Sequence, residues 1–192
     1  MTSTKAPSVW ENRVNRIVYW VLARWLWFLS GLLFIYAVVP WLSPLARAAG
    51  LDWLGQLLFI IYVPLCHQHA DRSFFVYGYQ VAFCHRDVAI YTTLFAGGLW
   101  FRLVRDWLKP LSWRVGVVLI LPMVLDGGSH LLEDLLQIGL RNNNHSVGSL
   151  NFWLRMVTGM LFAVAMICLV YPRVDRDLRM AQMPPRSPMV AG

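Results

Sequence analysis

The chain has 192 residues, of which 58% are hydrophobic, 14% are aromatic and only 14% are charged. Soluble domains carry more charge, so this composition predicts an integral membrane protein and excludes a disordered, collagen-like or disulfide-rich secreted chain. The net charge of +7 fits either nucleic-acid binding or basic membrane loops, and the positions of the basic residues decide between the two.

The first apolar segment, residues 17–42, is long enough to cross a hydrocarbon core of roughly 30 Å, which needs about 20 helical residues. It is too long and too rich in Trp for a signal peptide, so we expect it to remain in the mature protein. Arg24 lies within it, where a long side chain can reach the headgroups. Residues 1–16 are predicted to form a cytoplasmic N-terminal segment.

The second apolar run, residues 51–65, is marginal for a crossing and equally suited to a re-entrant helix. Further spans are predicted at about 80–101, at 113–125 with a helical continuation to 137, and at 150–171. The predicted fold is therefore an all-α integral membrane bundle of four to five transmembrane helices, the second of them short. Residues 17–171 form its single transmembrane domain, and residues 172–192 are expected to be a disordered cytoplasmic tail.

The basic residues cluster in three segments between the predicted spans. Three precede the first span, four lie in the loop 102–114 and four lie in the tail, together 11 of the 17 lysines and arginines. The positive-inside rule places these segments in the cytoplasm of a multi-pass protein of the cell (inner) membrane. The charge is thereby explained with membrane lipid as the partner and without nucleic acid. A homo-oligomer or a partner in a membrane complex is left open.

Two topologies fit these spans. If both ends are cytoplasmic, the chain crosses four times and residues 51–65 are re-entrant, whereas five crossings place the N-terminus outside. In both, four polar clusters meet at the extracytoplasmic face. They are residues 66–74, Gln80 with residues 84–87, Pro122 with residues 126–130, and Asn151 with Arg155, Thr158 and Gly159. Polar groups at membrane depth are costly, so they usually face a cavity and pair with one another.

These clusters resemble the prokaryotic membrane-protein family called domain of unknown function 2085. The matching residues over roughly 55–165 are Cys66, His67, Gln68, Arg72, Ser73, Phe74, Gln80, Cys84, Arg86, Ile90, Tyr91, Pro122, Asp126, Gly127, Arg155, Thr158 and Gly159. The chain departs from the family's Cys-Ala-Arg-Cys motif, in which His85 replaces the alanine and Asp87 replaces the second cysteine. A carboxylate can still bind a hard or borderline metal there.

A metal site is the first chemical interpretation, because thiolate, imidazole and carboxylate groups suit zinc or iron. The expected ligands are Cys66, His67, Cys84, Asp87 and Asp126, with His69 as a further candidate. Asp126 and His130 are spaced i, i+4, which puts both on one face of a helix.

Two other interpretations remain open. A disulfide between Cys66 and Cys84 would stabilise a loop at an oxidising face without any catalysis. Alternatively, Cys66 and Arg72 have the spacing of a cysteine-dependent phosphatase loop, although residues 67–71 contain no glycine.

Together these features predict a membrane enzyme with a metal- or thiol-based site at the extracytoplasmic helix ends, acting on a lipidic or amphipathic substrate. Cys66, Arg72, Arg86 and Arg155 are the expected catalytic residues, the arginines holding the substrate. The alternative is a non-catalytic accessory subunit or small transporter with a Cys66–Cys84 disulfide and a structural charge network.

Overall fold

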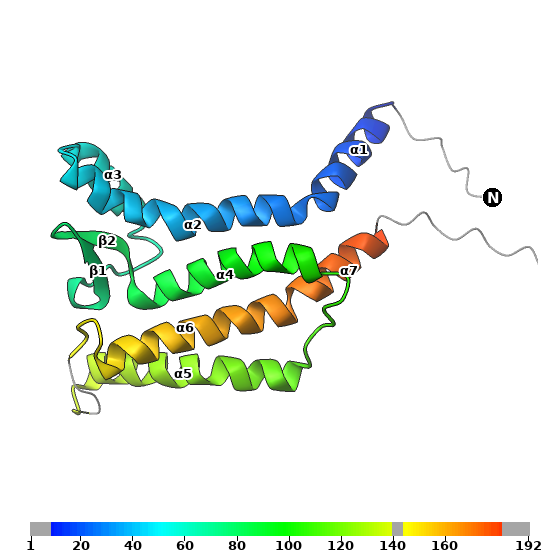
Figure 1. The fold of residues 1–192 in the computed structure, drawn as a ribbon. Helices are drawn as coiled ribbons and strands as arrows, with labels where there is room; N and C mark the ends of the chain where they lie inside the picture. The colour runs from blue at the N-terminus through cyan, green and yellow to red at the C-terminus, as the bar shows by residue number, and fades with distance from the viewer. Residues whose placement is uncertain (1–8, 140–143, 182–192) are drawn as a thin grey trace, which may run out of the picture.

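The computed structural model describes residues 9–139 and 144–181, most of them in helices (Figure 1). The elements are, in chain order, α1 (Val9–Ala23), α2 (Trp25–Ala48), α3 (Asp52–Ile61), a 3-10 turn (Ala70–Arg72), β1 (Ser73–Val76), β2 (Tyr79–Cys84), α4 (His85–Val104), α5 (Trp113–Leu136), α6 (Leu150–Leu169) and α7 (Tyr171–Ala181).

The long helices α2, α4, α6 and α5 lie alongside one another, with α4 between α2 and α6 and with α5 against α6 (Figure 1). The chain reverses direction from each of them to the next in sequence. As a result α1, α7 and the connection 105–112 lie at one end of the bundle, which we call the basic end. The other end, called the hairpin end, carries α3, the β-hairpin, the C-terminus of α5 and the N-terminus of α6.

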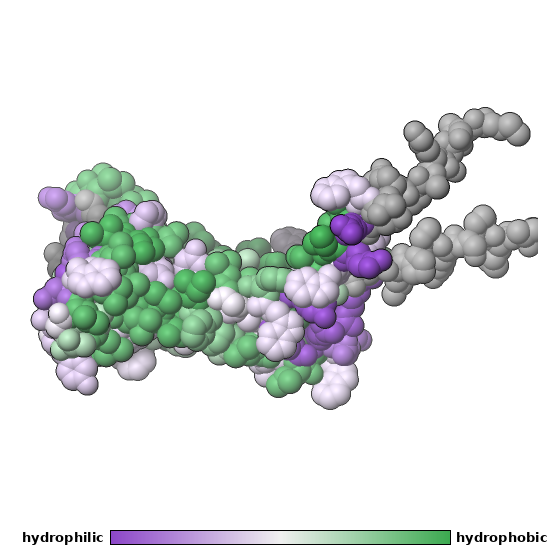
Figure 2. Space-filling model, turned by 90° about the horizontal axis from the view of Figure 1, so that it is seen from above, coloured by the Kyte–Doolittle hydropathy of each residue, from purple (hydrophilic) through white to green (hydrophobic). Residues whose placement is uncertain are grey.

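Within the described residues, three helical segments are long and apolar enough to cross a membrane, namely Trp25–Ala48, Trp113–Glu133 and Leu150–Ala181. Figure 2 shows an apolar belt between two more hydrophilic ends. Exposed apolar surface of this extent is typical of contact with lipid. The predicted helical membrane class agrees with these observations. The predicted count of four to five crossings is not established by them, because α4 carries Arg86, Asp87 and Arg102 and is not among the three.

The first predicted span, residues 17–42, is divided between two helices. The helical backbone is interrupted at Arg24, so α1 ends at Ala23 and α2 begins at Trp25. The Arg24 guanidinium lies 4.6 Å from the centre of the Trp20 ring. Compared with the predicted span 17–42, α2 therefore begins and ends several residues later in the chain, at Trp25 and Ala48.

The second apolar run forms the short helix α3, which at about 1.5 Å per residue is far too short to cross a membrane. It folds back on α2, where the Ser43 hydroxyl donates a 2.9 Å hydrogen bond to the Gly55 carbonyl. A Cβ at Gly55 would lie 2.8 Å from the Ser43 carbonyl oxygen, so only glycine permits this approach. The prediction of a short second helix agrees with this arrangement.

A β-hairpin corrects the all-α prediction. Strands β1 and β2 pair in antiparallel fashion through a turn at Tyr77 and Gly78, whose φ angles are +52° and +81°. Two successive positive φ angles are typical of the type I′ turn that matches strand twist. The third predicted span therefore begins in β2, and its helix starts only at His85.

The C-terminal region also differs from its prediction, because residues 171–181 form α7 where a disordered tail was expected. Asp175 secures this helix at the basic end. It accepts a 3.1 Å hydrogen bond from the Trp25 indole and lies 2.8 Å from Arg179 Nε. The rest of the predicted tail, residues 182–192, and the predicted N-terminal residues 1–8 lie outside the described residues.

Candidate functional site

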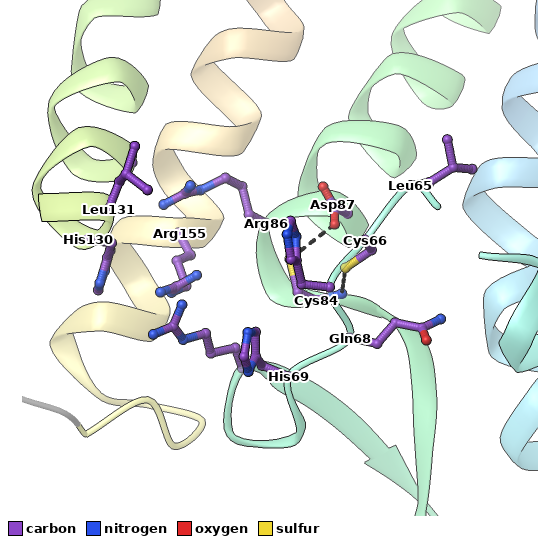
Figure 3. A pocket seen from close by; sticks show the side chains of 13 residues that line it. Leu65, Cys66, Gln68, His69, Cys84, Arg86, Asp87, His130, Leu131 and Arg155 are labelled. Carbon is purple, nitrogen blue, oxygen red and sulfur yellow. Dashed lines mark hydrogen bonds between the residues drawn. The ribbon is translucent and has the colours of Figure 1, made fainter. Parts of the chain in front are cut away.

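A cavity of about 340 Å³ opens at the hairpin end. Four parts of the chain supply its walls: the loop after α3, the start of α4, the end of α5 and the start of α6 (Figure 3). The lining residues are Leu65, Cys66, His67, Gln68, His69, Arg72, Cys84, Arg86, Asp87, Gly127, His130, Leu131 and Arg155. The polar clusters that the sequence predicted to meet do contribute to one pocket.

Cys66, Cys84 and Asp87 form the tightest group of potential metal ligands. One ligand atom from each lies within 4.8 Å of the other two. The Cys84 thiol donates a 3.1 Å hydrogen bond to Asp87 Oδ2, and the Cys84 amide donates a 3.3 Å bond to Cys66 Sγ (Figure 3). Cys84 ends β2 and Asp87 lies in the first turn of α4, so the strand-to-helix junction itself places these two side chains together.

The two thiols differ in acidity because they interact. A hydrogen bond from the Cys66 thiol to the Cys84 sulfur lowers the pKa of Cys84. The same bond, together with burial, raises the pKa of Cys66. Cys84 therefore loses its proton first, and Cys66 is the harder of the two to ionise. A metal ion, which binds the thiolate form, would displace both protons.

Gln68 holds the loop in place. Its backbone has a positive φ of 48°, and its side-chain amide donates to the carbonyls of Phe59 (2.8 Å) and Ala82 (2.9 Å). The Gln80 amide in turn donates to the Gln68 carbonyl at 2.6 Å. These bonds tie the loop to both α3 and β2. Cys66 is thereby fixed opposite Cys84.

The three predicted arginines face the same cavity but have different partners. Arg86 forms an ion pair with Asp126 from α5, and Arg72 Nε lies 3.5 Å from Asp71 Oδ2. Arg155 is only 4% exposed, and within the described part of the chain its Nε and Nη2 have no hydrogen-bond partner.

A glycine brings α6 close to α4 at this level. A Cβ at Gly159 would lie 3.0 Å from the Arg86 carbonyl oxygen and 3.2 Å from the Ala89 Cβ. The two helices can therefore approach only because position 159 has no side chain. This contact places Arg155, which lies one turn before Gly159, beside Arg86 in the wall of the cavity (Figure 3).

Two of the five predicted ligands are not in the three-residue group. Asp126 is 3% exposed and belongs to the charge cluster on α5, with His130 Nε2 3.8 Å from its Oδ1. The i, i+4 spacing of these two residues thus does bring them together. His67 lines the cavity, but its ring stacks with that of His69 at 6.3 Å between centroids.

The thiols of Cys66 and Cys84 are free and adjacent in this structure, and no bond joins them. Cys168 is also free and lies in the last turn of α6. The spacing of Cys66 and Arg72 is that of a cysteine-dependent phosphatase loop. In the structure the segment between them ends in the 3-10 turn Ala70–Arg72, and both residues line the same cavity.

Sequence reasoning missed the part played by the connection before α6. His145 is 5% exposed, its Nε2 lies 3.8 Å from Asp71 Oδ2, and its ring centroid is 5.4 Å from that of His130. The side chain of Asn151 donates a 2.9 Å bond to the Asn144 carbonyl. No spacing in the sequence indicates these contacts, because they join residues of separate segments.

The fold and the site together define a helical membrane protein with a polar, thiol-containing pocket at one end of its bundle. Residues 66–169, more than half of the chain, match the family described as Predicted membrane protein (DUF2085), and the chain belongs to this family. The family resemblance expected from the motifs is confirmed.

One curated relative, which is described as uncharacterized, matches most of the chain. The chain is 26% identical over 150 residues to the uncharacterized protein MJ1492 of Methanocaldococcus jannaschii, an alignment that covers 75% of this chain and 87% of that protein. No solved structure matches the chain.

Proposed function

We propose that the protein is a membrane-embedded enzyme whose pocket holds a zinc or iron ion on Cys66, Cys84 and Asp87 and acts on a lipidic or amphipathic substrate. The observation that carries this proposal is the mutual approach of the three ligand atoms, within 4.8 Å, at the wall of an open cavity. Structural zinc sites normally use four protein ligands, whereas three ligands leave a position for water.

The chemistry available to such a site is the activation of water. A zinc ion lowers the pKa of a bound water to about 7, which makes a nucleophile at neutral pH. Arg72, Arg86 and Arg155 line the same cavity and are suited to hold an anionic part of the substrate. Without a metal, Cys84 is the better candidate for a nucleophilic thiolate than Cys66, since its pKa is the lowered one.

The orientation of the bundle is a second part of the proposal. We propose that α4 is a fourth crossing and that the pocket opens at the extracytoplasmic face of the cell membrane. Helix α4 lies between α2 and α6, and its Arg102 is directed to the basic end, where it lies 3.5 Å from the centre of the Trp27 ring. The basic segments gather at that end, which the positive-inside rule assigns to the cytoplasm. A cysteine placed at Ser112 should then be labelled by an impermeant maleimide only in inverted vesicles, and labelling of intact cells would contradict this orientation.

Metal analysis of protein purified without chelator tests the metal site. We expect one zinc or iron per chain in the wild type and in the control Cys168→Ser. We expect loss of the metal in Cys66→Ser, Cys84→Ser and Asp87→Asn. Asp126→Asn should retain it, because Asp126 is engaged with Arg86. A metal-free wild type in which Cys66 and Cys84 are oxidised would refute the proposal and favour a non-catalytic membrane subunit.

A further inference from the structure

The buried guanidinium of Arg155 is the feature of the pocket that the metal proposal leaves unexplained. The residue is only 4% exposed, and its Nε and Nη2 have no hydrogen-bond partner in the described part of the chain. Leaving a charged group buried and unpaired costs considerably more than leaving a neutral one, so such groups normally have a counter-charge. Arg155 lines the cavity, so a ligand can supply that charge.

The carboxylates near the pocket are already engaged. Asp126 pairs with Arg86, Asp71 lies beside Arg72, and Asp87 accepts the hydrogen bond from the Cys84 thiol. Among the described residues, carboxylates therefore pair with two of the three arginines of the cavity, and Arg155 is the one without a carboxylate partner.

We propose that Arg155, with Arg72 and Arg86 beside it, forms a subsite for a phosphate group, and that the substrate is a lipid with a phosphate at its polar end. This inference deepens the proposed function and depends on it only for the reaction that follows binding. A carboxylate offers two oxygens and a single charge. A phosphate monoester offers three oxygens and a charge of about −1.5 to −2 at pH 7, enough to accept the fork of Arg155 and to bond a second guanidinium.

The rim of the cavity favours a lipid over free phosphate. Leu65 and Leu131 line the cavity from opposite sides and are 48% and 60% exposed (Figure 3). Leu65 belongs to the loop after α3 and Leu131 to the C-terminal part of α5, so both lie at the hairpin end of the bundle. A volume of about 340 Å³ is at the small end of the range for ligand pockets, so it suits a headgroup with its chain outside.

Calorimetric titration of the detergent-purified full chain tests the subsite. The probes are a short-chain phosphatidic acid, the matching phosphatidylcholine, inorganic phosphate and a short-chain fatty acid. We expect the phosphatidic acid to bind most tightly. Arg155→Met should weaken it by about tenfold or more, because a bond to a charged group is lost. Arg155→Lys should recover part of the affinity, and the exposed control Arg176→Gln should match the wild type.

Three results would overturn the inference. If Arg155→Met elutes as a single species in size-exclusion chromatography and binds phosphatidic acid as tightly as the wild type, Arg155 has no role in binding. If the fatty acid binds as tightly as phosphatidic acid, the site has no preference for phosphate. If inorganic phosphate binds as tightly as phosphatidic acid, the lipid chain contributes nothing.

Cys84→Ser distinguishes the metal proposal from the phosphate subsite, because this variant should lose the metal and still bind phosphatidic acid. If the wild type holds no metal yet binds the lipid through Arg155, the metal proposal fails and this inference stands. If metal is bound and Arg155→Met binds the lipid normally, the reverse holds.

Discussion

The buried ion pair between Arg86 and Asp126 makes a quantitative prediction about stability. The side chains of Arg86 and Asp126 are 17% and 3% exposed, and Arg155 is a second cation in the same cavity. Asp126→Ala removes the counter-charge of Arg86 and leaves the guanidinium groups of Arg86 and Arg155 in the same cavity without it. Breaking one partner of a buried pair costs about 3–5 kcal/mol. At about 2–4 °C per kcal/mol for a chain of this length, the unfolding midpoint should fall by about 6–20 °C.

The double variant Arg86→Met/Asp126→Leu isolates the charge effect. Replacing a buried pair by apolar side chains of similar volume is often neutral or stabilising, so this variant should recover most of the lost stability. Circular dichroism at 222 nm, a standard helix wavelength, follows thermal unfolding in detergent, since the chain is mostly helical. Asp177→Ala is the matched control, because Asp177 is 62% exposed and pairs with Arg176 at the basic end. A normal midpoint for Asp126→Ala, or a double variant as unstable as the single one, would refute the reasoning.

Three further predictions concern the supports of the pocket. Gly159→Ala should force α6 away from α4 and lower the free energy of unfolding by about 1–3 kcal/mol. Gly31→Ala is the control, because a Cβ there meets open space, and it should leave the stability unchanged. Equal thermal unfolding midpoints for the two variants would contradict the close approach of the helices. In chelator-treated protein, the pH midpoint for alkylation of Cys84 should lie below that of an ordinary thiol, because the pKa of Cys84 is lowered. Cys66→Ala removes the hydrogen bond from Cys66 and should raise this midpoint. Alkylation followed by mass spectrometry measures the midpoint, and an unchanged midpoint in Cys66→Ala would contradict the role of the hydrogen bond. Gln68→Ala, which loses the bonds to Phe59 and Ala82, should release metal to a chelator faster than the exposed control Gln137→Ala, and equal release rates would count against the anchoring role of Gln68.

Much of the architecture is predictable because the bilayer constrains it strongly. Apolar length indicates the membrane class, and the polar residues that break the apolar pattern indicate the pocket. Cys66, Cys84 and Asp87 were named from residue type alone, and the structure brings them within 4.8 Å of one another. Cys66 and Cys84 also belong to the motifs on which the family resemblance rests, whereas Asp87 departs from them; the family match covers residues 66–169.

The hairpin was not predicted, although its signal is present. Tyr77-Gly78 lies between two runs rich in aromatic and branched residues, which is typical of a two-residue turn. The apolar side chains of Val81, Ala82 and Phe83 made residues 80–84 look like the start of a helix, yet all three are buried in strand β2. Apolar composition alone does not distinguish a short buried strand from a helical segment.

Spacing predicts the approach of Asp126 and His130, but it does not predict the charge partners that come from different elements. Asp126 is a predicted metal ligand, and in the structure its Oδ2 accepts a hydrogen bond from Arg86, 40 positions earlier in the chain. The packing of α5 and α6 against α4 decides this choice. The same packing buries Arg155 with its Nε and Nη2 unbonded within residues 9–139 and 144–181, which only the assembled pocket reveals.

X-ray absorption spectroscopy of the metal in the purified protein tests the central claim most directly, because it counts the sulfur ligands. The proposed site predicts two sulfur neighbours at about 2.3 Å if the metal is zinc, with oxygen completing the coordination shell. The Cys84→Ser protein, reconstituted with zinc, should show at most one. A shell of nitrogen and oxygen alone in the wild type would contradict binding by Cys66 and Cys84.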